Sequence, residues 1–252
     1  LPKFCSLFKT MGLRKGFQVD LLTCIIRRLY RDPTNLEAGL QSTTTSAAVG
    51  RSSLESEHTL SAPISFSGVG LHSGALVNLR VLPAPPGHGI VFHRVDLENF
   101  PIEATVKNVA HVAYATTLMK QGVLISTIEH LLSSLYIFGI DNAVVELDNL
   151  EVPILDGSAL EFVSAIQRVG LQKQSAPRTY IVIRKELHLQ ERGKTISIYP
   201  SSTFQISYSI DFPHPMIGKQ TYEFDASPKT FARDIAPART FGFLHEVEEL
   251  KK

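Results

Sequence analysis

The stretch LISTIEHLLSSLYIFGIDN, residues 124–142, decides how the chain is organised. Its apolar residues recur at helical spacing, and glycine commonly ends a helix, so Gly139 and the pattern before it predict a helix over residues 127–138. Glu129 and His130 stand side by side in the predicted first turn. A solvated first turn explains such a pair in most proteins, because a carboxylate there faces the positive end of the helix dipole. The alternative is a functional pair.

The zinc signatures of proteases do not fit this pair, because they place two histidines on one face of a helix. Ser126 stands where the motif H-x-x-E-H would need its first histidine. His245 and Glu246 begin an H-E pair, but no second histidine follows them. If His130 binds a metal, its partner ligands therefore come from elsewhere in the chain. Glu129 is then placed to act as the general base that activates water.

The composition of the 252-residue chain predicts a folded protein with a substantial core, because 44% of its residues are hydrophobic. No apolar run approaches the roughly 18 residues of a membrane-spanning helix. Residues 1–55 carry eight basic and four acidic residues, whereas the remainder carries 17 basic and 20 acidic ones. The remainder has no basic stripe, so we expect no nucleic-acid partner. Both cysteines, Cys5 and Cys24, precede it, so a metal there would have His, Asp or Glu ligands.

Residues 1–56 have the composition of a leader rather than of a domain. The segment GLRKGFQVDLLTCIIRRLYR is amphipathic and carries several arginines, and the residues after it are rich in serine, threonine and alanine. Such leaders are typical of organellar transit peptides. We expect a mitochondrial location, with a plastid as the alternative, and a disordered linker is the simpler interpretation. A secretory signal is disfavoured because LLTCII is short and is followed by two arginines.

The residues after the leader predict a sheet with two helices. The strands that we expect cover residues 59–66, 75–82, 89–94, 112–119 and 142–148. A second helix is expected over residues 158–170, after the predicted helix that carries Glu129.

The same order of elements restarts after residues 172–177. The strands expected there cover residues 179–191, 194–201, 204–212 and 219–225, and a helix over 228–238 follows. We therefore expect the α+β class, with two similar units over residues 57–174 and 175–252, the second of them incomplete.

Four motifs outside the helix carry possible chemistry. GVGLHSG, residues 68–74, has the wrong spacing for a dinucleotide fingerprint and predicts a tight turn between strands. SIDFPHP, residues 209–215, suits either a cradle for a sugar or base, or a rigid turn. EVPILDGSALEF, residues 151–162, predicts a structural, side-chain-capped helix start. ARTFGF, residues 238–243, predicts a loop with a hydroxyl, a cation and a glycine.

Taken in order and spacing, the motifs GVGLHSG, ISTIEHLLSSL with GIDN, EVPILDGSA and ARTFGF resemble one family. It is the bacterial-type UDP-3-O-acyl-N-acetylglucosamine deacetylase, the zinc amidase of lipid A biosynthesis. The resemblance runs from about Thr59 to the last residues. It implies two domains, each a layered β-α-α-β sandwich, with the active site between them. With the transit-like leader, it leads us to expect a plant organellar form.

The resemblance also implies roles for individual residues. His130 matches the first ligand of Zn²⁺, Glu129 matches the general base, and Thr240 matches the hydroxyl that stabilises the oxyanion. The residues implied to meet the substrate are Phe241 and Gly242 in its site, Lys185, Asp211 and Phe212 at its UDP part, and Leu71 and His72 in a nearby loop.

The resemblance is incomplete at its C-terminal end. The family supplies two further zinc ligands, a His and an Asp, and a second catalytic His, and no matching motif occurs before Lys252. His245 and the glutamates after it are not expected to replace them. Two expectations follow: a C-terminally truncated, monomeric form of the zinc deacetylase acting on a UDP-sugar lipid, or a catalytically dead homologue that at most binds such a lipid.

Overall fold

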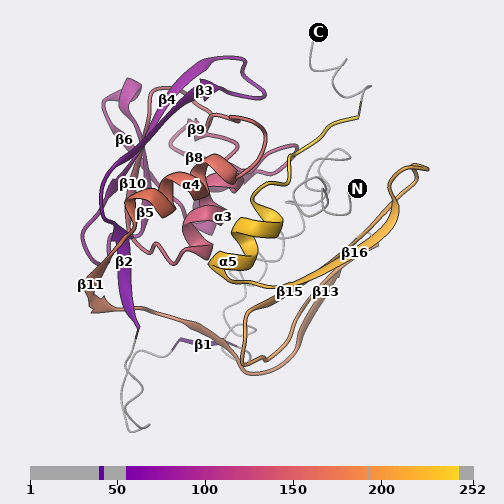
Figure 1. The fold of residues 1–252 in the computed structure, drawn as a ribbon. Helices are drawn as coiled ribbons and strands as arrows, with labels where there is room; N and C mark the ends of the chain where they lie inside the picture. Colours follow the sequence, from indigo (N-terminus) through magenta and orange to yellow (C-terminus); the bar gives the residue numbers. More distant parts are fainter. Residues whose placement is uncertain (1–39, 43–54, 192, 244–252) are drawn as a thin grey trace, which may run out of the picture.

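The computed structural model describes residues 40–42, 55–191 and 193–243 (Figure 1). The predicted leader, apart from residues 40–42, and the pair His245–Glu246 lie outside these residues. The centre of the fold is a five-stranded sheet. In spatial order its strands are β3 (Ile64–Val69), β4 (Leu76–Pro83), β10 (Ala143–Leu147), β5 (Ile90–Arg94) and β6 (Phe100–Glu103). Only the pairing of β10 with β5 is parallel.

One face of this sheet is buried because its strands alternate. In β4 the side chains of Val77, Leu79 and Val81 are buried, and the residues between them are exposed. Alternation with a period of two places all three on the same face. Helices α3 (Glu129–Ile137) and α4 (Leu160–Val169) cover that face, and their apolar side chains join the sheet in one core (Figure 1).

The remaining strands of the first unit form two small sheets. β2 (Ser56–Leu60) pairs antiparallel with β11 (Leu171–Pro177). β7 (Val109–His111), β8 (Thr117–Lys120) and β9 (Val123–Ile125) form a three-stranded sheet before α3. Two 3₁₀ turns accompany these strands: η1 (Val95–Leu97) joins β5 to β6, and η2 (Val106–Asn108) leads into β7.

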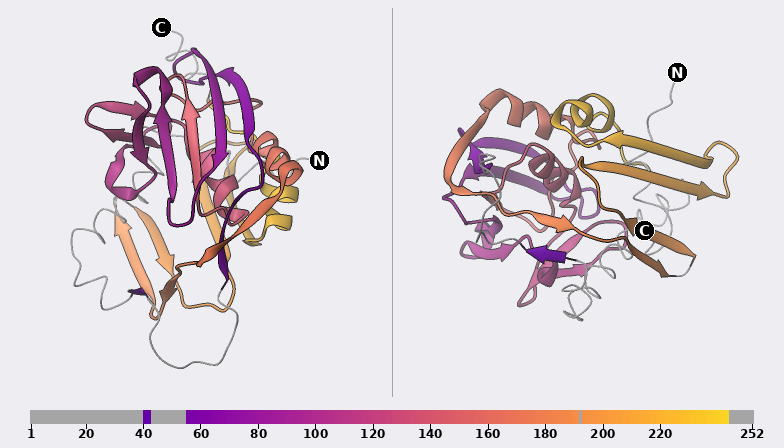
Figure 2. Two further views of the ribbon diagram at one scale, coloured as in Figure 1. Left: turned by 90° about the vertical axis from the view of Figure 1, so that its left-hand side faces the viewer. Right: turned by 90° about the horizontal axis from the view of Figure 1, so that it is seen from below.

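The strands from β12 onward, which fall in the expected second unit, form three two-stranded sheets, and two of these are hairpins. β12 (Ile181–Ile183) pairs with β1 (Leu40–Ser42), β13 (Leu187–Glu191) with β14 (Lys194–Ile198), and β15 (Gln205–Phe212) with β16 (Gly218–Asp225). Helix α5 (Pro228–Thr230) and the π-helical turn η3 (Phe231–Ile235) follow. The helices lie between the central sheet and the hairpins (Figure 2).

The second unit has little core of its own. Among the residues whose burial is described, none between Leu171 and Thr230 is fully buried. Phe231 and Ile235 of η3 are buried, and they pack with Ala159 and Val163 at the start of α4. The end of the second unit is therefore anchored to the first. In the described part of the chain, no helix has the length and apolar character that crossing a membrane requires.

The α+β class is confirmed, and three expected strands are wrong in extent. The expected strand over 59–66 is two strands, because Pro63 has no N–H and the chain changes partner there, from β11 to β4. The expected strand over 112–119 begins only at Thr117, because Tyr114 has a φ of 63°, a left-handed conformation that a strand cannot contain. The expected strand over 179–191 is interrupted at residues 184–186.

Candidate functional site

The site begins at the N-terminal end of α3, where Glu129 and His130 stand in the first turn. Thr127, just before them, has a φ of 58°, which is strained for a β-branched residue. Ser126 holds this backbone in place: its N–H donates to Leu150 O at 2.9 Å, and its own carbonyl accepts from Val152 N at 3.0 Å. The helix start is thus tied to residues 150–152.

The Glu129 carboxylate has the properties of a general base near neutral pH. Burial raises the pKa of Glu129 to about 7, and the negative charge of Glu151 acts in the same direction. The backbone N–H of Thr116 donates to Glu129 Oε2 at 3.1 Å, which partly offsets the rise in pKa and orients the carboxylate. A carboxyl group with this pKa can both accept and return a proton at physiological pH.

His130 is held as a neutral imidazole. The residue is 6% exposed, and burial lowers its pKa, although a hydrogen bond to the Ser158 backbone and the charge of Asp156 act in the opposite direction. The neutral form is the one that ligates metals, and a backbone partner on one ring nitrogen fixes the ring orientation. His130 is therefore suited to be a ligand.

Glu151 is a buried support of the site whose partners the sequence did not predict. Residues 151–162 are expected to be structural, and the Glu151 carboxylate, in a residue 1% exposed, has such a role because it joins two segments distant in sequence. It accepts from the backbone N–H groups of His72 at 3.1 Å and Ser73 at 2.8 Å, and from Thr127 Oγ1 at 2.7 Å. The only local signal was a carboxylate preceding the apolar run VPIL.

The motif GVGLHSG forms the expected tight turn between β3 and β4. Gly70 N donates to Ala75 O at 2.9 Å, and Gly74 N donates to Gly70 O at 3.0 Å. A Cβ on Gly70 would lie 2.4 Å from Glu151 Oε2, so glycine is required for the close approach of this carboxylate. The turn places Leu71 and His72 at the surface, where Leu71 is 48% exposed.

The turn over residues 156–158 connects His130 with the loop that carries Thr240. Thr240 N donates to the carbonyl of Gly157 at 2.8 Å, and Arg239 Nε lies 3.6 Å from Asp156 Oδ2. The Ser158 backbone of the same turn is the hydrogen-bond partner of His130. His130 and Thr240, which are far apart in sequence, are thus held by one turn.

An aromatic cluster gathers residues from two of the quoted motifs. The ring of Phe243 lies 5.9 Å from that of Phe241 and 6.2 Å from that of Phe212, measured between centroids. His214 adds a fourth ring, 5.5 Å from Phe243. Lys185 and Asp211 are exposed, and the roles given to them, to Gly242 and to the aromatic residues stay predictions.

The described residues do not complete a zinc site. A catalytic zinc normally has three protein ligands and a water. Across residues 40–42, 55–191 and 193–243, no group of three or more His, Cys, Asp or Glu side chains is arranged to hold a metal ion. His130 is the one implied ligand that this part of the chain supplies.

Comparison with known proteins gives a consistent result. The family model described as LpxC, UDP-3-O-acyl N-acetylglycosamine deacetylase, matches residues 57–252. The UDP-3-O-acyl-N-acetylglucosamine deacetylase of Solibacter usitatus is 48% identical over 195 residues, or 77% of this chain and 66% of the relative. Those of Myxococcus xanthus and Syntrophotalea carbinolica are 49% and 45% identical, over 80% and 77% of this chain. The chain spans 66%, 65% and 63% of the lengths of these three relatives.

Proposed function

Because the chain belongs to the UDP-3-O-acyl N-acetylglycosamine deacetylase family, we propose that it takes part in hydrolysing the N-acetyl group of UDP-3-O-acyl-N-acetylglucosamine. The reaction releases acetate and a free amine and is a step of lipid A biosynthesis. The single observation that carries this proposal is the pair Glu129–His130, a carboxyl group with a pKa of about 7 beside a buried, neutral imidazole. A capped, solvated helix turn would show neither property.

The proposed chemistry assigns a proton transfer to Glu129 and charge stabilisation to Thr240. Glu129 takes a proton from the attacking water, whose oxygen bonds to the acetyl carbon. The Thr240 hydroxyl donates to the oxygen on which negative charge develops. The C–N bond then breaks, and the amine leaves with the proton that Glu129 took from the water. The turn at Gly157 holds the Thr240 backbone for this role.

Zinc is part of the proposal and needs ligands besides His130. When bound, zinc polarises the carbonyl group and acidifies water. Of the described residues, His130 would hold it, and the fixed orientation of its ring supports this role. Since these residues supply one implied ligand, no step above is assigned to the metal.

The substrate is proposed to bind across two layered β-α-α-β sandwich domains, the first of them built on the central sheet. Lys185, Asp211 and Phe212 would contact the UDP part. The residues proposed to line the rest of the site are Leu71, His72, Phe241 and Gly242. The contact of Phe241 and Phe212 through Phe243 supports a continuous surface. We further propose a monomer, as the family resemblance implies. On the composition of residues 1–56, we propose that it is located in the mitochondrion, with the plastid as the alternative.

A second candidate function is a catalytically inactive homologue that binds UDP-sugar lipids. The observation that favours it is the lack of a metal-holding cluster among the described residues. The zinc content of the purified full chain, measured by elemental analysis after exhaustive dialysis, separates the two candidates. Near-stoichiometric zinc that is lost in His130→Ala supports the deacetylase. The same low zinc content in both proteins supports the binding protein.

A further inference from the structure

The side chain of Arg178, which follows β11, fastens the connection between the two expected units. Its guanidinium group donates to both oxygens of Asp141, from Nε to Oδ1 at 2.9 Å and from Nη2 to Oδ2 at 2.7 Å. Nη2 also donates to the carbonyl of Gly139, and Nη1 lies 3.5 Å from Glu55 Oε2. A planar fork that meets a carboxylate in this bidentate way fixes direction as well as distance.

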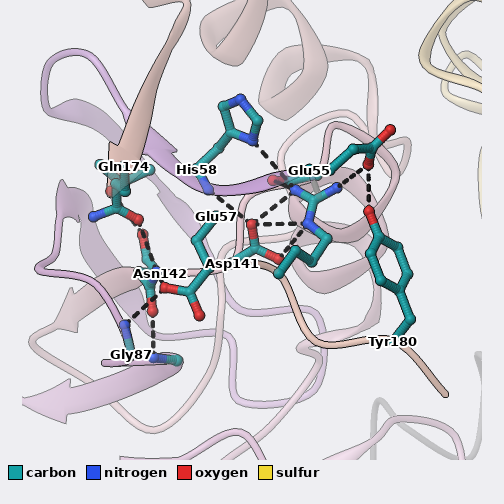
Figure 3. A network of polar contacts seen from close by, with 12 residues as sticks. Glu55, Glu57, His58, Gly87, Asp141, Asn142, Gln174 and Tyr180 are labelled. Atoms are coloured by element: carbon teal, nitrogen blue, oxygen red, sulfur yellow. Dashed lines mark hydrogen bonds and ion pairs between the residues drawn. The ribbon is translucent and has the colours of Figure 1, made fainter. Parts of the chain in front are cut away.

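Asp141 and Asn142 join this fork to the first unit. Asp141 Oδ2 accepts from the backbone N–H of His58 at 2.8 Å, and Asp141 N donates to His58 O at 2.9 Å. The Asn142 amide donates to Glu57 Oε2 and to Gln174 Oε1, each at 2.8 Å (Figure 3). Arg178 therefore binds residues that are themselves held by several hydrogen bonds.

Arg178 also contacts the C-terminal end of α3, the helix whose first turn carries the candidate catalytic pair. Gly139 ends α3, with a φ of 71°, and Glu129 and His130 begin it. A Cβ on Gly139 would lie 2.8 Å from Arg178 Nη2, so glycine is needed both for the backbone and for the approach of the arginine. A short helix moves as a nearly rigid body, so a displacement of its C-terminal end also displaces its N-terminal end.

The segment from β12 to β16 is held mainly at its two ends. Its beginning follows Arg178, and its end leads into Phe231 and Ile235, which pack against α4. Between these anchors the hairpins contribute no fully buried described residue, although Phe204 contacts Tyr136 of α3 at 5.9 Å between ring centroids. The Arg178 contacts are the polar anchor of this segment at the helix.

We propose that Arg178 is a positioning residue that fixes the orientation of the β12–β16 segment against α3. It thereby sets the distance from Glu129 to Lys185 and Asp211, which stand on that segment. The effect on substrate binding rests on the proposed function, whereas the positional effect does not. Arg178 itself touches no reacting atom.

The test compares two substitutions with a matched control. Arg178→Gln removes the charge and the fork, and Arg178→Lys keeps the charge but cannot reach Gly139 and both Asp141 oxygens together. Arg80→Gln is the control, because Arg80 pairs with Glu146 at 3.1 Å on adjacent strands within the central sheet. Arg80→Gln makes the same chemical change at an ion pair that lies within one unit.

The direct measurement is the distance between two spin labels in the full chain, with Cys5 and Cys24 replaced by serine. The labels are placed at the exposed positions Gln167 on α4 and Thr195 on β14. One narrow distance distribution is expected for the wild type and for Arg80→Gln, and a shifted or broadened one for Arg178→Gln. An unchanged distribution in Arg178→Gln overturns the proposal. Should Arg178→Gln fail to fold by circular dichroism, Arg178→Lys is judged by the same criterion.

The functional consequence is measured with UDP as the probe, titrated into the same unlabelled proteins. Arg178→Gln is expected to weaken UDP binding about tenfold, Arg178→Lys less, and Arg80→Gln not at all. Equal UDP affinity in wild type and Arg178→Gln overturns the consequence for substrate binding. If the wild type itself does not bind UDP, the proposed UDP contacts fail, while the spin-label distances still decide the position of the segment.

Discussion

Glu151 and Thr127 are joined across the start of α3, because Thr127 Oγ1 donates to Glu151 Oε1 at 2.7 Å. Thr127 lies two residues before Glu129 and adopts a left-handed backbone, so this bond stabilises a strained residue beside the candidate base. The same carboxylate binds the backbone of the β3–β4 turn. One buried anion therefore organises both sides of the site.

Replacing Glu151 by alanine is expected to destabilise the fold strongly. The Thr127 hydroxyl would be left buried without an acceptor, and the backbone N–H groups of His72 and Ser73 would lose theirs. The expected loss is about 3 kcal/mol of unfolding free energy. Glu151→Gln keeps one acceptor oxygen and should lose about 1 to 2 kcal/mol. Urea unfolding measures both values. An alanine variant as stable as the wild type would contradict the role given to this carboxylate.

The stability of the metal-free chain should fall as the pH rises through the pKa of Glu129. Its pKa is about 7 in the folded state against a model value of 4.5, so the folded state binds the proton more tightly. This difference in pKa does not change the free energy of unfolding below the unfolded-state pKa. Above that pH it lowers the free energy of unfolding progressively, and the loss is complete above the folded-state pKa. Glu129→Gln, which stays neutral, should therefore be more stable than the wild type by about 3 kcal/mol near pH 8.

This prediction is checked by urea unfolding with a chelator present, at about pH 5 and about pH 8. The stability gap between Glu129→Gln and the wild type should widen with pH. A gap that is the same at both pH values would show that the carboxylate ionises as easily in the folded state as in the unfolded chain.

Two glycines of one turn should respond differently to alanine. A Cβ on Gly70 would lie 2.2 Å from Ser73 Oγ and 2.4 Å from Glu151 Oε2, so the turn must move away from the carboxylate. The expected loss is about 2 kcal/mol or more. Gly74, with a φ of 64° and open space around it, is the matched control and should lose about 1 kcal/mol from backbone strain alone. Thermal unfolding measures the stability of both variants. If Gly70→Ala loses no more stability than Gly74→Ala, the close approach of Glu151 to Gly70 would be contradicted.

Thr240→Val should reduce acetate release without unfolding the chain. Valine has the shape of threonine but no hydroxyl donor, so stabilisation of the developing oxyanion is lost and kcat should fall about 100-fold with little change in KM. Steady-state kinetics against Thr240→Ser, which keeps the hydroxyl, separates this effect from packing. Equal loss in the serine and valine variants would assign Thr240 a packing role instead.

The sequence predicted those parts of the fold whose signals are local. The alternation of β4 and the run that ends at Gly139 each fix an element within a few residues, and both are found where expected. The break at Pro63 was not predicted, because the residues on both sides of it alternate as one strand would, although a proline cannot donate a hydrogen bond within a strand.

The supports of the site could not be predicted in this way, because their partners are distant in sequence. Glu151 receives its hydrogen bonds from residues 79, 78 and 24 positions away, and Arg178 reaches Asp141 across 37 positions. Periodicity and capping rules describe neighbours along a helix or strand. Only the folded chain shows that the Glu151 carboxylate, which precedes an apolar run, faces the turn between β3 and β4.

The measurement that tests the account most directly is acetate release from UDP-3-O-acyl-N-acetylglucosamine by the full chain with added zinc, compared with Glu129→Gln. The account predicts release by the wild type and a loss of at least about 100-fold in the variant, because the group that accepts the proton from water is removed. Equal release by both proteins, with the wild type zinc-loaded, would contradict the assignment of Glu129 as the base and of the α3 start as the catalytic centre.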